Sequence, residues 1–334
     1  GEPGIDPDTS ASEVAEAAGT TLEHLREEAD RGEAMEAMGE GATAIAERMH
    51  DAGELSGIMG LGGSGNTSIA TTAMRALPVG VPKLMVSTMA SGDTEPYVGA
   101  RDIMMLYSVA DIEGLNQLSR QVIANAALAM VGMVTNEPDV EVESKPTVGI
   151  TMFGVTTPCA KTARAYLEDR GYETIVFHAT GTGGRAMESL VDEGVIDGVL
   201  DITTTEWADE LVGGNLNAGP ERLDAAAEAG IPQVVSTGAL DMVNFGPRES
   251  VPEQFDDRLF HIHNPQVTLM RTTAEENAEL GGIIGEKLNA ATGPTALALP
   301  LGGVSMLDVE GEDFYDPEAD AALFGAIRDT LDPN

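Results

Sequence analysis

Short apolar segments alternate with amphipathic segments along most of this chain, and a glycine-rich polar loop follows several of the apolar segments. Strands and helices in such regular alternation form βαβ units, in which the strands are parallel and the helices cover the sheet. The pattern therefore predicts an α/β fold. We expect two Rossmann-like three-layer domains with mostly parallel sheets.

Residues 135–146 separate the two predicted domains. This segment holds two prolines and a run of charged residues, and it shows no helical period. We expect a nucleotide-binding domain over residues 1–140 and a second α/β domain with its own polar site over residues 146–334. The chain starts at Gly1 without a methionine, so we expect the first domain to lack a leading strand.

The predicted elements follow from apolar periodicity and from glycine and proline breaks. In the first domain they are two helices within residues 10–51 with a glycine break near residues 39–41, strands at 55–61, 82–87 and 102–109, a helix ending near residue 77 and an apolar helix around residues 122–134. In the second domain the strands are 147–153, 173–177, 198–202, 233–236 and 295–300, and the helices are 158–170, 185–193, 220–229, 273–291 and 317–331.

The first glycine-rich loop contains Gly60-x-Gly62-x-x-Gly65 between a strand and a helix, which satisfies the dinucleotide-binding fingerprint. A NAD site also needs an acidic residue at the end of the next strand, where this chain has Ser87 and Thr88. The Gly-Lys-Ser/Thr of a Walker loop is absent as well. We interpret the loop as an anion cradle of backbone amides and hydroxyls. The alternative is a tight turn in which glycine permits close packing.

A second polar loop, residues 87–94, follows the next strand, at the sheet edge where doubly wound proteins bind ligands. We predict that the two loops together hold the phosphates of a nucleotide. The predicted binding residues are Gly62, Gly63, Ser64, Gly65, Asn66, Thr67, Ser87, Thr88, Ser91, Gly92 and Asp93.

The second domain carries polar residues on its own strand-end loops. Residues 178–185 combine glycine amides, hydroxyls, an imidazole and a guanidinium at a helix start, which suits a phosphate or a carboxylate. Glu206 belongs to an acidic segment, which also fits the first turn of a helix capped by Thr205. The candidate ligand contacts are Thr180, Gly181, Thr182, Gly183, Gly184, Asp241, Asn264 and Arg271.

His261 and His263 stand at strand spacing, so an extended backbone places them on one side. A metal pair would need further ligands, and we predict no metal site. Cys159 begins a helix, where it is either a nucleophile or a small packed residue. The candidate catalytic residues of this domain are His178, Arg185, Glu206, His261 and His263.

Composition excludes several classes of protein. The chain has 18 Lys and Arg against 56 Asp and Glu, so we expect no general nucleic-acid binding. Its longest apolar stretch falls short of the roughly 20 residues that span a bilayer, and we expect no membrane partner. The single cysteine cannot form an internal disulfide, which favours the cytoplasm. The distributed acids and scarce lysines favour a halophilic protein, with an ordinary acidic mesophile as the alternative.

Several segments together resemble the UPF0261 family, whose members are also described as Tm-1-like ATP-binding proteins. They are GLGGSGNT at 60–67, STMASGD at 87–93, FHATGTGGRAME at 177–188, GALDMVNF at 238–245, and residues 263–265, 271–273 and 300–305. The resemblance implies ATP, with or without Mg²⁺, in the first domain, and a homodimer. Family members usually begin with a strand and a Gly-Thr-x-Asp-Thr-Lys loop, which this chain does not contain. We therefore expect a haloarchaeal member without that strand and loop.

Two functions remain open from the sequence. The first is a nucleotide-binding protein whose glycine-rich strand-end loops hold the phosphates. The alternative is a metabolic enzyme that acts on a phosphorylated or carboxylated small molecule through the His, Arg and Glu residues of the second domain. The sequence does not decide whether ATP would be hydrolysed or only bound.

Overall fold

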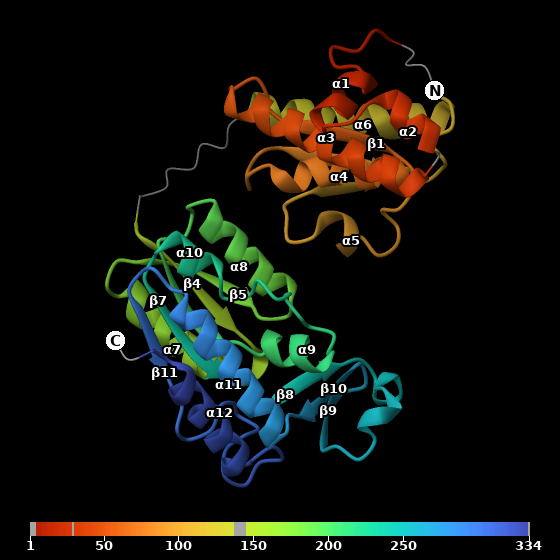
Figure 1. Cartoon of the computed structure of the whole chain (residues 1–334). Coiled ribbons are helices and arrows are strands. Elements are labelled where there is room, and N and C mark those ends of the chain that lie inside the picture. Colours follow the sequence, from red (N-terminus) through yellow and green to blue (C-terminus); the bar gives the residue numbers. More distant parts are fainter. Residues whose placement is uncertain (1–4, 29, 137–144, 333–334) are drawn as a thin grey trace. The chain divides into compact units, whose positions relative to one another are not determined.

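The structure, a computed structural model, describes residues 5–28, 30–136 and 145–332. The chain divides into two compact units, Gly1–Glu141 and Val142–Asn334 (Figure 1). Each unit contains a parallel sheet, and the second unit adds a small antiparallel one. The predicted α/β class with mostly parallel sheets is confirmed. The expected domain linker falls largely on residues 137–144, which lie outside the described residues.

Unit 1 is built on three parallel strands in the order β1-β2-β3. The strands are β1 (Ile58–Gly62), β2 (Lys83–Ser87) and β3 (Met104–Tyr107). The helices are α1 (Ala11–Ala17), α2 (Leu22–Glu28), α3 (Arg31–Asp51), α4 (Ser64–Ala76), α5 (Glu95–Val98) and α6 (Gln117–Thr135). In the register, Gly62 pairs with Ser87 and Ser87 pairs with Tyr107, so the three carboxyl ends lie level.

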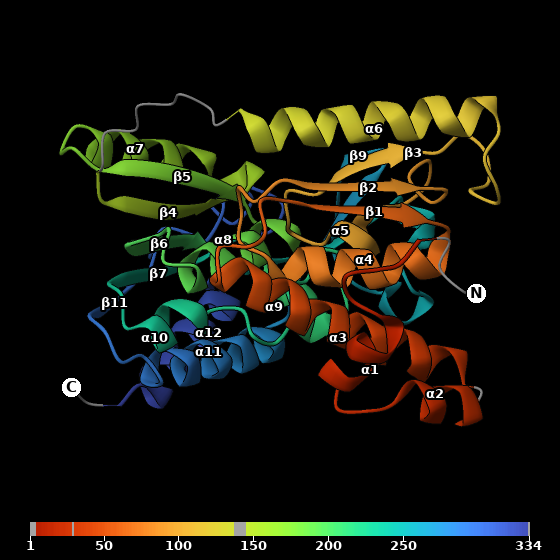
Figure 2. The same cartoon turned by 90° about the horizontal axis from the view of Figure 1, so that it is seen from above.

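Helices cover both faces of this sheet. Figure 2 shows α6 along one face and α4 with α3 on the other. On the α6 face, Leu84 and Val86 of β2 pack against Ala126. On the other face, Ala73 of α4 packs against Ala46 of α3. The predicted loops lie at the carboxyl ends of these strands.

The sequence predicted two helices before β1, with a break near residues 39–41, and that break is wrong. α3 runs through Gly39 and Gly41 without interruption. The two glycines are buried, and a Cβ atom on Gly41 would lie 1.9 Å from the carbonyl oxygen of Val14 in α1. The glycine therefore permits close helix contact, which offsets its low helix propensity.

The main sheet of unit 2 has five parallel strands in the order β11-β7-β6-β4-β5. They are β4 (Thr147–Met152), β5 (Glu173–His178), β6 (Gly198–Thr203), β7 (Gln233–Gly238) and β11 (Thr295–Ala298). The helices are α7 (Thr157–Glu168), α8 (Thr182–Asp192), α9 (Glu206–Val212), α10 (Ala225–Ala229), α11 (Ala274–Asn289) and α12 (Pro317–Thr330). α7 covers one face, and α8, α10, α11 and α12 cover the other (Figure 2).

The first strand of unit 2, β4, lies between β5 and β6. The chain therefore builds the sheet outward in both directions from β4. Loops that leave adjacent strands toward opposite faces open a crevice at the carboxyl edge, and α/β proteins bind ligands there. This edge of unit 2 is the place where its polar loops meet.

An antiparallel sheet in the order β8-β10-β9 was not predicted. Its strands are β8 (Met242–Phe245), β9 (Phe260–Asn264) and β10 (Val267–Arg271). Three short 3-10 helices occur at Gly154–Thr156, Arg248–Ser250 and Glu253–Phe255. The predicted helix 220–229 begins only at Ala225, because the preceding turn has Leu223 at φ 78° and turns Arg222 into the interior.

α6 is long and apolar enough, by length and composition, to cross a membrane, and among the described helices it alone meets that test. A helix of this kind is weak evidence for a span. Its inner side packs against β2 through Ala126, as a helix of an α/β domain does.

Candidate functional site

The two polar loops predicted to hold a nucleotide adjoin each other at the carboxyl edge of unit 1. The backbone nitrogen of Thr88 donates to the carbonyl oxygen of Gly62 at 3.2 Å. The hydroxyl oxygens of Thr67 and Ser87 lie 2.6 Å apart and share a hydrogen bond. The loop after β1 and the loop after β2 are therefore tied directly to each other.

The amino end of α4 is open to an anion. Gly63 is its N-cap residue and supplies no side-chain hydrogen bond, and the first turn contains no acidic residue. By contrast, α3 is capped by Asp30, whose carboxylate accepts from the backbone nitrogens of Gly32 and Glu33. Uncapped backbone amides and the helix dipole make such an end favourable for negative charge.

An arginine that the sequence interpretation missed lies beside this helix end. A Cβ atom on Gly65 would lie 3.5 Å from Nη2 of Arg31. Arg31 is the first residue of α3 and is exposed, and no hydrogen bond or ion pair joins it to any of the side chains that the structure describes. Arg31 and Gly65 are far apart in sequence, so only the packing of α3 on α4 brings the cation to the glycine loop.

The predicted binding residues of unit 1 differ in exposure. Ser64, Asn66, Ser91, Gly92 and Asp93 are exposed; Gly63, Gly65 and Thr88 are half-buried; and Gly62, Thr67 and Ser87 are buried. The Ser87 hydroxyl also accepts from the backbone nitrogen of Met89 at 2.9 Å. Thr67 and Ser87 therefore connect the loops from inside, and the exposed residues remain accessible from solvent.

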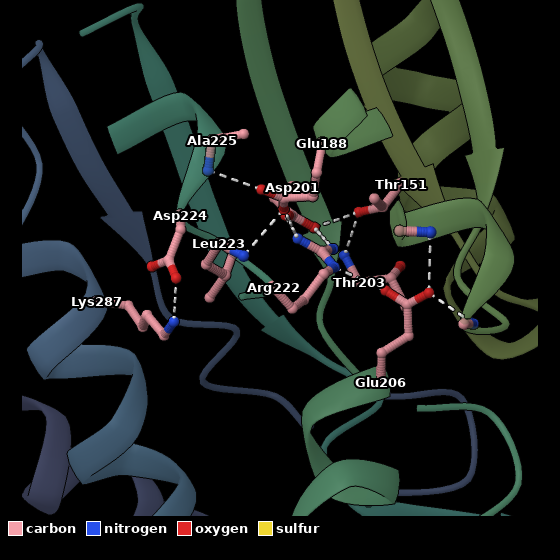
Figure 3. A network of polar contacts seen from close by, with 12 residues as sticks. Thr151, Glu188, Asp201, Thr203, Glu206, Arg222, Leu223, Asp224, Ala225 and Lys287 are labelled. Atoms are coloured by element: carbon pink, nitrogen blue, oxygen red, sulfur yellow. Dashed lines mark hydrogen bonds and ion pairs between the residues drawn. The ribbon is translucent and has the colours of Figure 1, made fainter. Parts of the chain in front are cut away.

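In unit 2, the glycine loop holds an anion that belongs to the protein. Oε1 of Glu206 accepts from the backbone nitrogens of Gly181 at 2.7 Å and Gly184 at 3.0 Å (Figure 3). A Cβ atom on Gly184 would lie 2.2 Å from Oε2 of the same carboxylate. In place of the external ligand that we predicted for these amides, the loop binds Glu206. Glu206, which we predicted as a catalytic residue, is therefore buried and already hydrogen-bonded to the loop.

Glu206 belongs to a buried cluster around Arg222 (Figure 3). Nε of Arg222 lies 2.7 Å from Glu206, and its Nη1 and Nη2 donate to the two oxygens of Asp201 at 2.5 and 2.8 Å. Nη1 also lies 3.0 Å from Glu188 of α8. Three carboxylates thus converge on one guanidinium and connect β6, α8 and α9. Sequence reasoning found Glu206 but missed Arg222, Asp201 and Glu188 as its partners.

Burial sets the protonation properties of this cluster. Desolvation raises the pKa of Glu188, although Arg222 and the backbone amides of Leu223 and Ala225 act against that rise. For Arg222, desolvation lowers the pKa, but the attraction of Asp201 and Glu206 outweighs it, so the pKa is raised. The guanidinium remains charged and holds the cluster together.

The other predicted residues of unit 2 are dispersed. His178 is exposed and its ring centroid lies 5.5 Å from that of Phe153, while Nη1 of Arg185 donates to the carbonyl oxygen of Asn217. Thr180 donates to the carbonyl oxygen of His178, and Thr182 and Gly183 form the half-buried start of α8.

The two candidate histidines lie on the antiparallel sheet. Nδ1 of His261 lies 2.7 Å from Oδ2 of Asp313, and His263 and Asn264 are exposed on the same strand. Within the described residues, no group of three or more His, Cys, Asp and Glu side chains is placed to hold a metal ion. Among the same residues, no hydrogen bond or ion pair connects His261 or His263 to the Arg222 cluster.

Arg271 and Asp241 take part in a second buried network. Nη2 of Arg271 lies 3.1 Å from Asp308 and 3.4 Å from Asp320 of α12. Oδ2 of Asp241 accepts from the Ser305 hydroxyl at 2.7 Å, and its Oδ1 has no partner in the described part of the chain. Desolvation raises the pKa of Asp241 to about 7, with Asp308 adding to that rise and both Ser305 and Arg271 opposing it.

The protein thus has two α/β units, each with a glycine-rich loop at the end of a strand. The loop of unit 1 is open to an anion, and the loop of unit 2 is filled by a carboxylate. These features define a two-domain Rossmann-like protein. The chain belongs to the uncharacterised protein family UPF0261. The N-terminal domain of that family matches residues 1–139, and its C-terminal domain matches residues 145–334.

Relatives come from bacteria and from a plant. A UPF0261 protein of Clostridium tetani is 58% identical over 332 residues, which cover 99% of this chain and 82% of the relative. A UPF0261 protein of Rhizobium meliloti is 53% identical, over 90% of this chain and 75% of the relative. The ToMV resistance protein Tm-1(GCR237) of Solanum lycopersicum is 49% identical, over 91% of this chain and 41% of the plant protein. These relatives do not support the expected haloarchaeal source.

Proposed function

We propose that this protein binds ATP through its phosphates at the β1–α4 loop of unit 1. The observation that carries the proposal is the open amino end of α4, with the guanidinium of Arg31 beside Gly65. In a chain with 56 acidic residues, the first turn of α4 has none. A helix end of this kind, next to a guanidinium, suits a polyanion.

The glycine loop of unit 2 supports this interpretation of unit 1. Both loops connect a parallel strand to a helix whose start has no side-chain cap from its own N-cap residue. In unit 2 the loop amides bind the carboxylate of Glu206, so a loop of this kind binds negative charge in this protein. The loop of unit 1 has no such internal carboxylate within the described residues.

The residues of unit 1 fit a phosphate chain in number and type. The first-turn amides of α4 and the guanidinium of Arg31 would contact phosphate oxygens, with the exposed Ser64 and Asn66 at the same turn. Thr88 and Ser91 would add hydroxyls from the second loop. Asp93 is the acidic residue of that loop and would be the protein contact of Mg²⁺, which usually retains waters and phosphate oxygens as its other ligands. The bound nucleotide would supply a triphosphate whose charge these groups neutralise.

The proposal is one of binding, and the alternative of an enzyme built on His178, Glu206 and the β9 histidines has weaker support. Glu206 is already bound by two amides and by Arg222. His178 ends the strand that leads into the glycine loop, but His261 and His263 stand on a different sheet. A cytoplasmic homodimer with an acidic surface adapted to salt remains a prediction from composition and resemblance.

Thermal shift with ATP and Mg²⁺ tests the proposal on the full chain. We expect ATP to raise the melting temperature of the wild type, and Arg31→Ala to weaken binding about tenfold because a charge-assisted contact is lost. Arg120→Ala is the matched control, since Arg120 is an exposed arginine on α6. A shift that is equal in the two variants would place the nucleotide elsewhere, and the absence of any shift in the wild type would refute ATP binding.

A further inference from the structure

A cavity of about 220 Å³ lies at the carboxyl edge of the main sheet of unit 2. Its walls come from the start of α7, from β6 and β7, and from the loop after β11. It therefore adjoins the crevice between β4 and β6. On one side of this crevice the chain adds β5, and on the other side it adds β7 and β11. None of the five candidate catalytic residues of this unit lines it, although Cys159, which the sequence left open as a nucleophile, does.

Ser305 lines this cavity and is hydrogen-bonded to a buried carboxylate. Its hydroxyl donates to Oδ2 of Asp241 at 2.7 Å and accepts from the backbone nitrogen of Leu307 at 3.0 Å. Ser305 is 7% exposed and Asp241 is 0% exposed. A serine whose proton points to a buried carboxylate has the arrangement of a nucleophile and its base.

Asp241 is only partly satisfied, which is unusual for a buried carboxylate. Its Oδ1 has no hydrogen-bond partner within the described residues. A buried acceptor without a partner is costly and calls for a reason, of which a catalytic role is one. Oδ1 of Asp241 can thus accept a further hydrogen bond, and its partner Ser305 lines the cavity.

The backbone around the pair is held in a fixed and partly strained conformation. Ala239, two residues before Asp241, has φ 59°, in the left-handed region that non-glycine residues seldom adopt. Its backbone nitrogen donates to the carbonyl oxygen of Val304, the neighbour of Ser305. Strain of this kind persists only where the surrounding structure holds it, and it concentrates at functional sites.

The start of α7 supplies a positive end to the same cavity. α7 has 12 residues, no side-chain hydrogen bond at its N-cap residue Thr156, and no acidic residue in its first turn. Cys159 of that turn lines the cavity with its backbone N–H group in the helix start, together with Pro158, which has no N–H. Amides at such a helix end stabilise negative charge that develops on an oxygen.

We propose that this cavity is a second site, which hydrolyses a short-chain carboxylic ester with Ser305 as the nucleophile and Asp241 as its base. The Ser305 oxygen bonds to the ester carbonyl carbon while its proton passes to Oδ2 of Asp241. The carbon–oxygen bond to the alcohol breaks, and the alcohol leaves with that proton. A water molecule then attacks the acyl-serine, gives its proton to Asp241 and releases the acid, and the proton returns to Ser305.

The size and lining of the cavity favour a small, largely apolar substrate. Its size admits a small acyl group, and its lining is mainly apolar, with Val155, Ile202 and Val304 among the walls. The pKa of Asp241, raised to about 7 by burial, suits a base that works near neutral pH. Arg271 and Asp308 are the charged neighbours whose opposing effects tune it.

A larger cavity of about 470 Å³ at the opposite edge of the sheet does not offer this chemistry. It is lined mainly by apolar side chains at the amino ends of the strands, such as Val148 and Val234. No serine, cysteine or histidine lines it. The smaller cavity is thus the one with a nucleophile and a base together.

Covalent labelling of the folded full chain with a fluorophosphonate tests the proposal. We expect a single adduct by intact mass, mapped to Ser305, and loss of that adduct in Ser305→Ala. Asp241→Asn, which keeps the shape of the side chain, should slow labelling at least about a hundredfold because the base is lost. Ser250→Ala is the matched control, because Ser250 is an exposed serine that does not line the cavity, and this variant should label as the wild type does.

Circular dichroism on each variant separates a folding defect from a loss of reactivity. Labelling of the wild type alone already tests whether Ser305 is a nucleophile. A folded wild type that is unlabelled, or labelled at another residue, would overturn the proposal. Equal labelling rates in the wild type and Asp241→Asn would overturn the role of Asp241. Because the site lies in unit 2, these results are independent of ATP binding in unit 1.

Discussion

Oε1 of Glu206 lies 2.7 Å from the backbone nitrogen of Gly181 and accepts its hydrogen bond. The same carboxylate reaches Arg222 through Oε2, so one side chain connects the glycine loop to a buried cation. The amides of this loop thus have a permanent internal anion. The loop of unit 1 is of the same kind, and among the described residues no carboxylate binds its amides; this contrast underlies the proposal that a nucleotide binds there.

Glu206→Gln tests this contact. Glutamine retains an oxygen for the loop amides but leaves Arg222 without one of its charged partners. Breaking one member of a buried ion pair typically costs about 3–5 kcal/mol, and we expect a loss of that order in urea unfolding. Glu168→Gln is the control, because Glu168 forms an exposed pair with Arg164. Comparable losses in both variants would contradict the structural importance of the Arg222 cluster.

Gly184→Ala probes the same cluster through its packing. The added Cβ atom would lie 2.2 Å from Oε2 of Glu206, so either the carboxylate or the loop must move. We expect a clear drop in melting temperature. Gly325→Ala in α12 meets no atom within 4 Å and should be neutral or slightly stabilising. Thermal unfolding of the two variants checks this difference, and a neutral Gly184→Ala would show that the loop is not filled.

Asp241 makes stability depend on pH. Because burial raises its pKa to about 7, the folded protein binds this proton more tightly than the unfolded chain does. Its contribution to stability is complete below the ordinary pKa of about 4 and is lost as pH rises through about 7. Urea unfolding should show Asp241→Asn close to the wild type near pH 5 and more stable than the wild type near pH 8. The reverse order at the higher pH would mean that Asp241 is stabilised as a charged group.

Salt should stabilise the protein if its charge excess dominates the surface. With a formal net charge of -38, the folded chain repels itself, and added salt screens that repulsion. We expect the melting temperature to rise steadily with sodium chloride. A melting temperature that stays constant or falls would favour the interpretation as an ordinary acidic protein.

The parallel strands were predictable because each is a short apolar run bounded by glycine or proline, as in β2 and β4. The antiparallel sheet was not, since β8 has only four residues and β9 is largely exposed, so neither gives a strong periodic signal. The sequence indicated both glycine loops. It did not indicate that Glu206 fills one and Arg31 flanks the other, because those contacts depend on how helices pack.

The most direct test of the nucleotide assignment is isothermal titration of ATP with Mg²⁺ into the wild type, Gly65→Asp and Gly132→Asp. A Cβ atom on Gly65 makes only ordinary contacts, so the aspartate is accommodated and places a negative charge at the start of α4 beside Arg31. Gly132, on α6, meets no atom within 4 Å and serves as the control for the same substitution. We predict binding in the wild type and in Gly132→Asp, and none in Gly65→Asp. Undiminished binding in a folded Gly65→Asp would contradict the account.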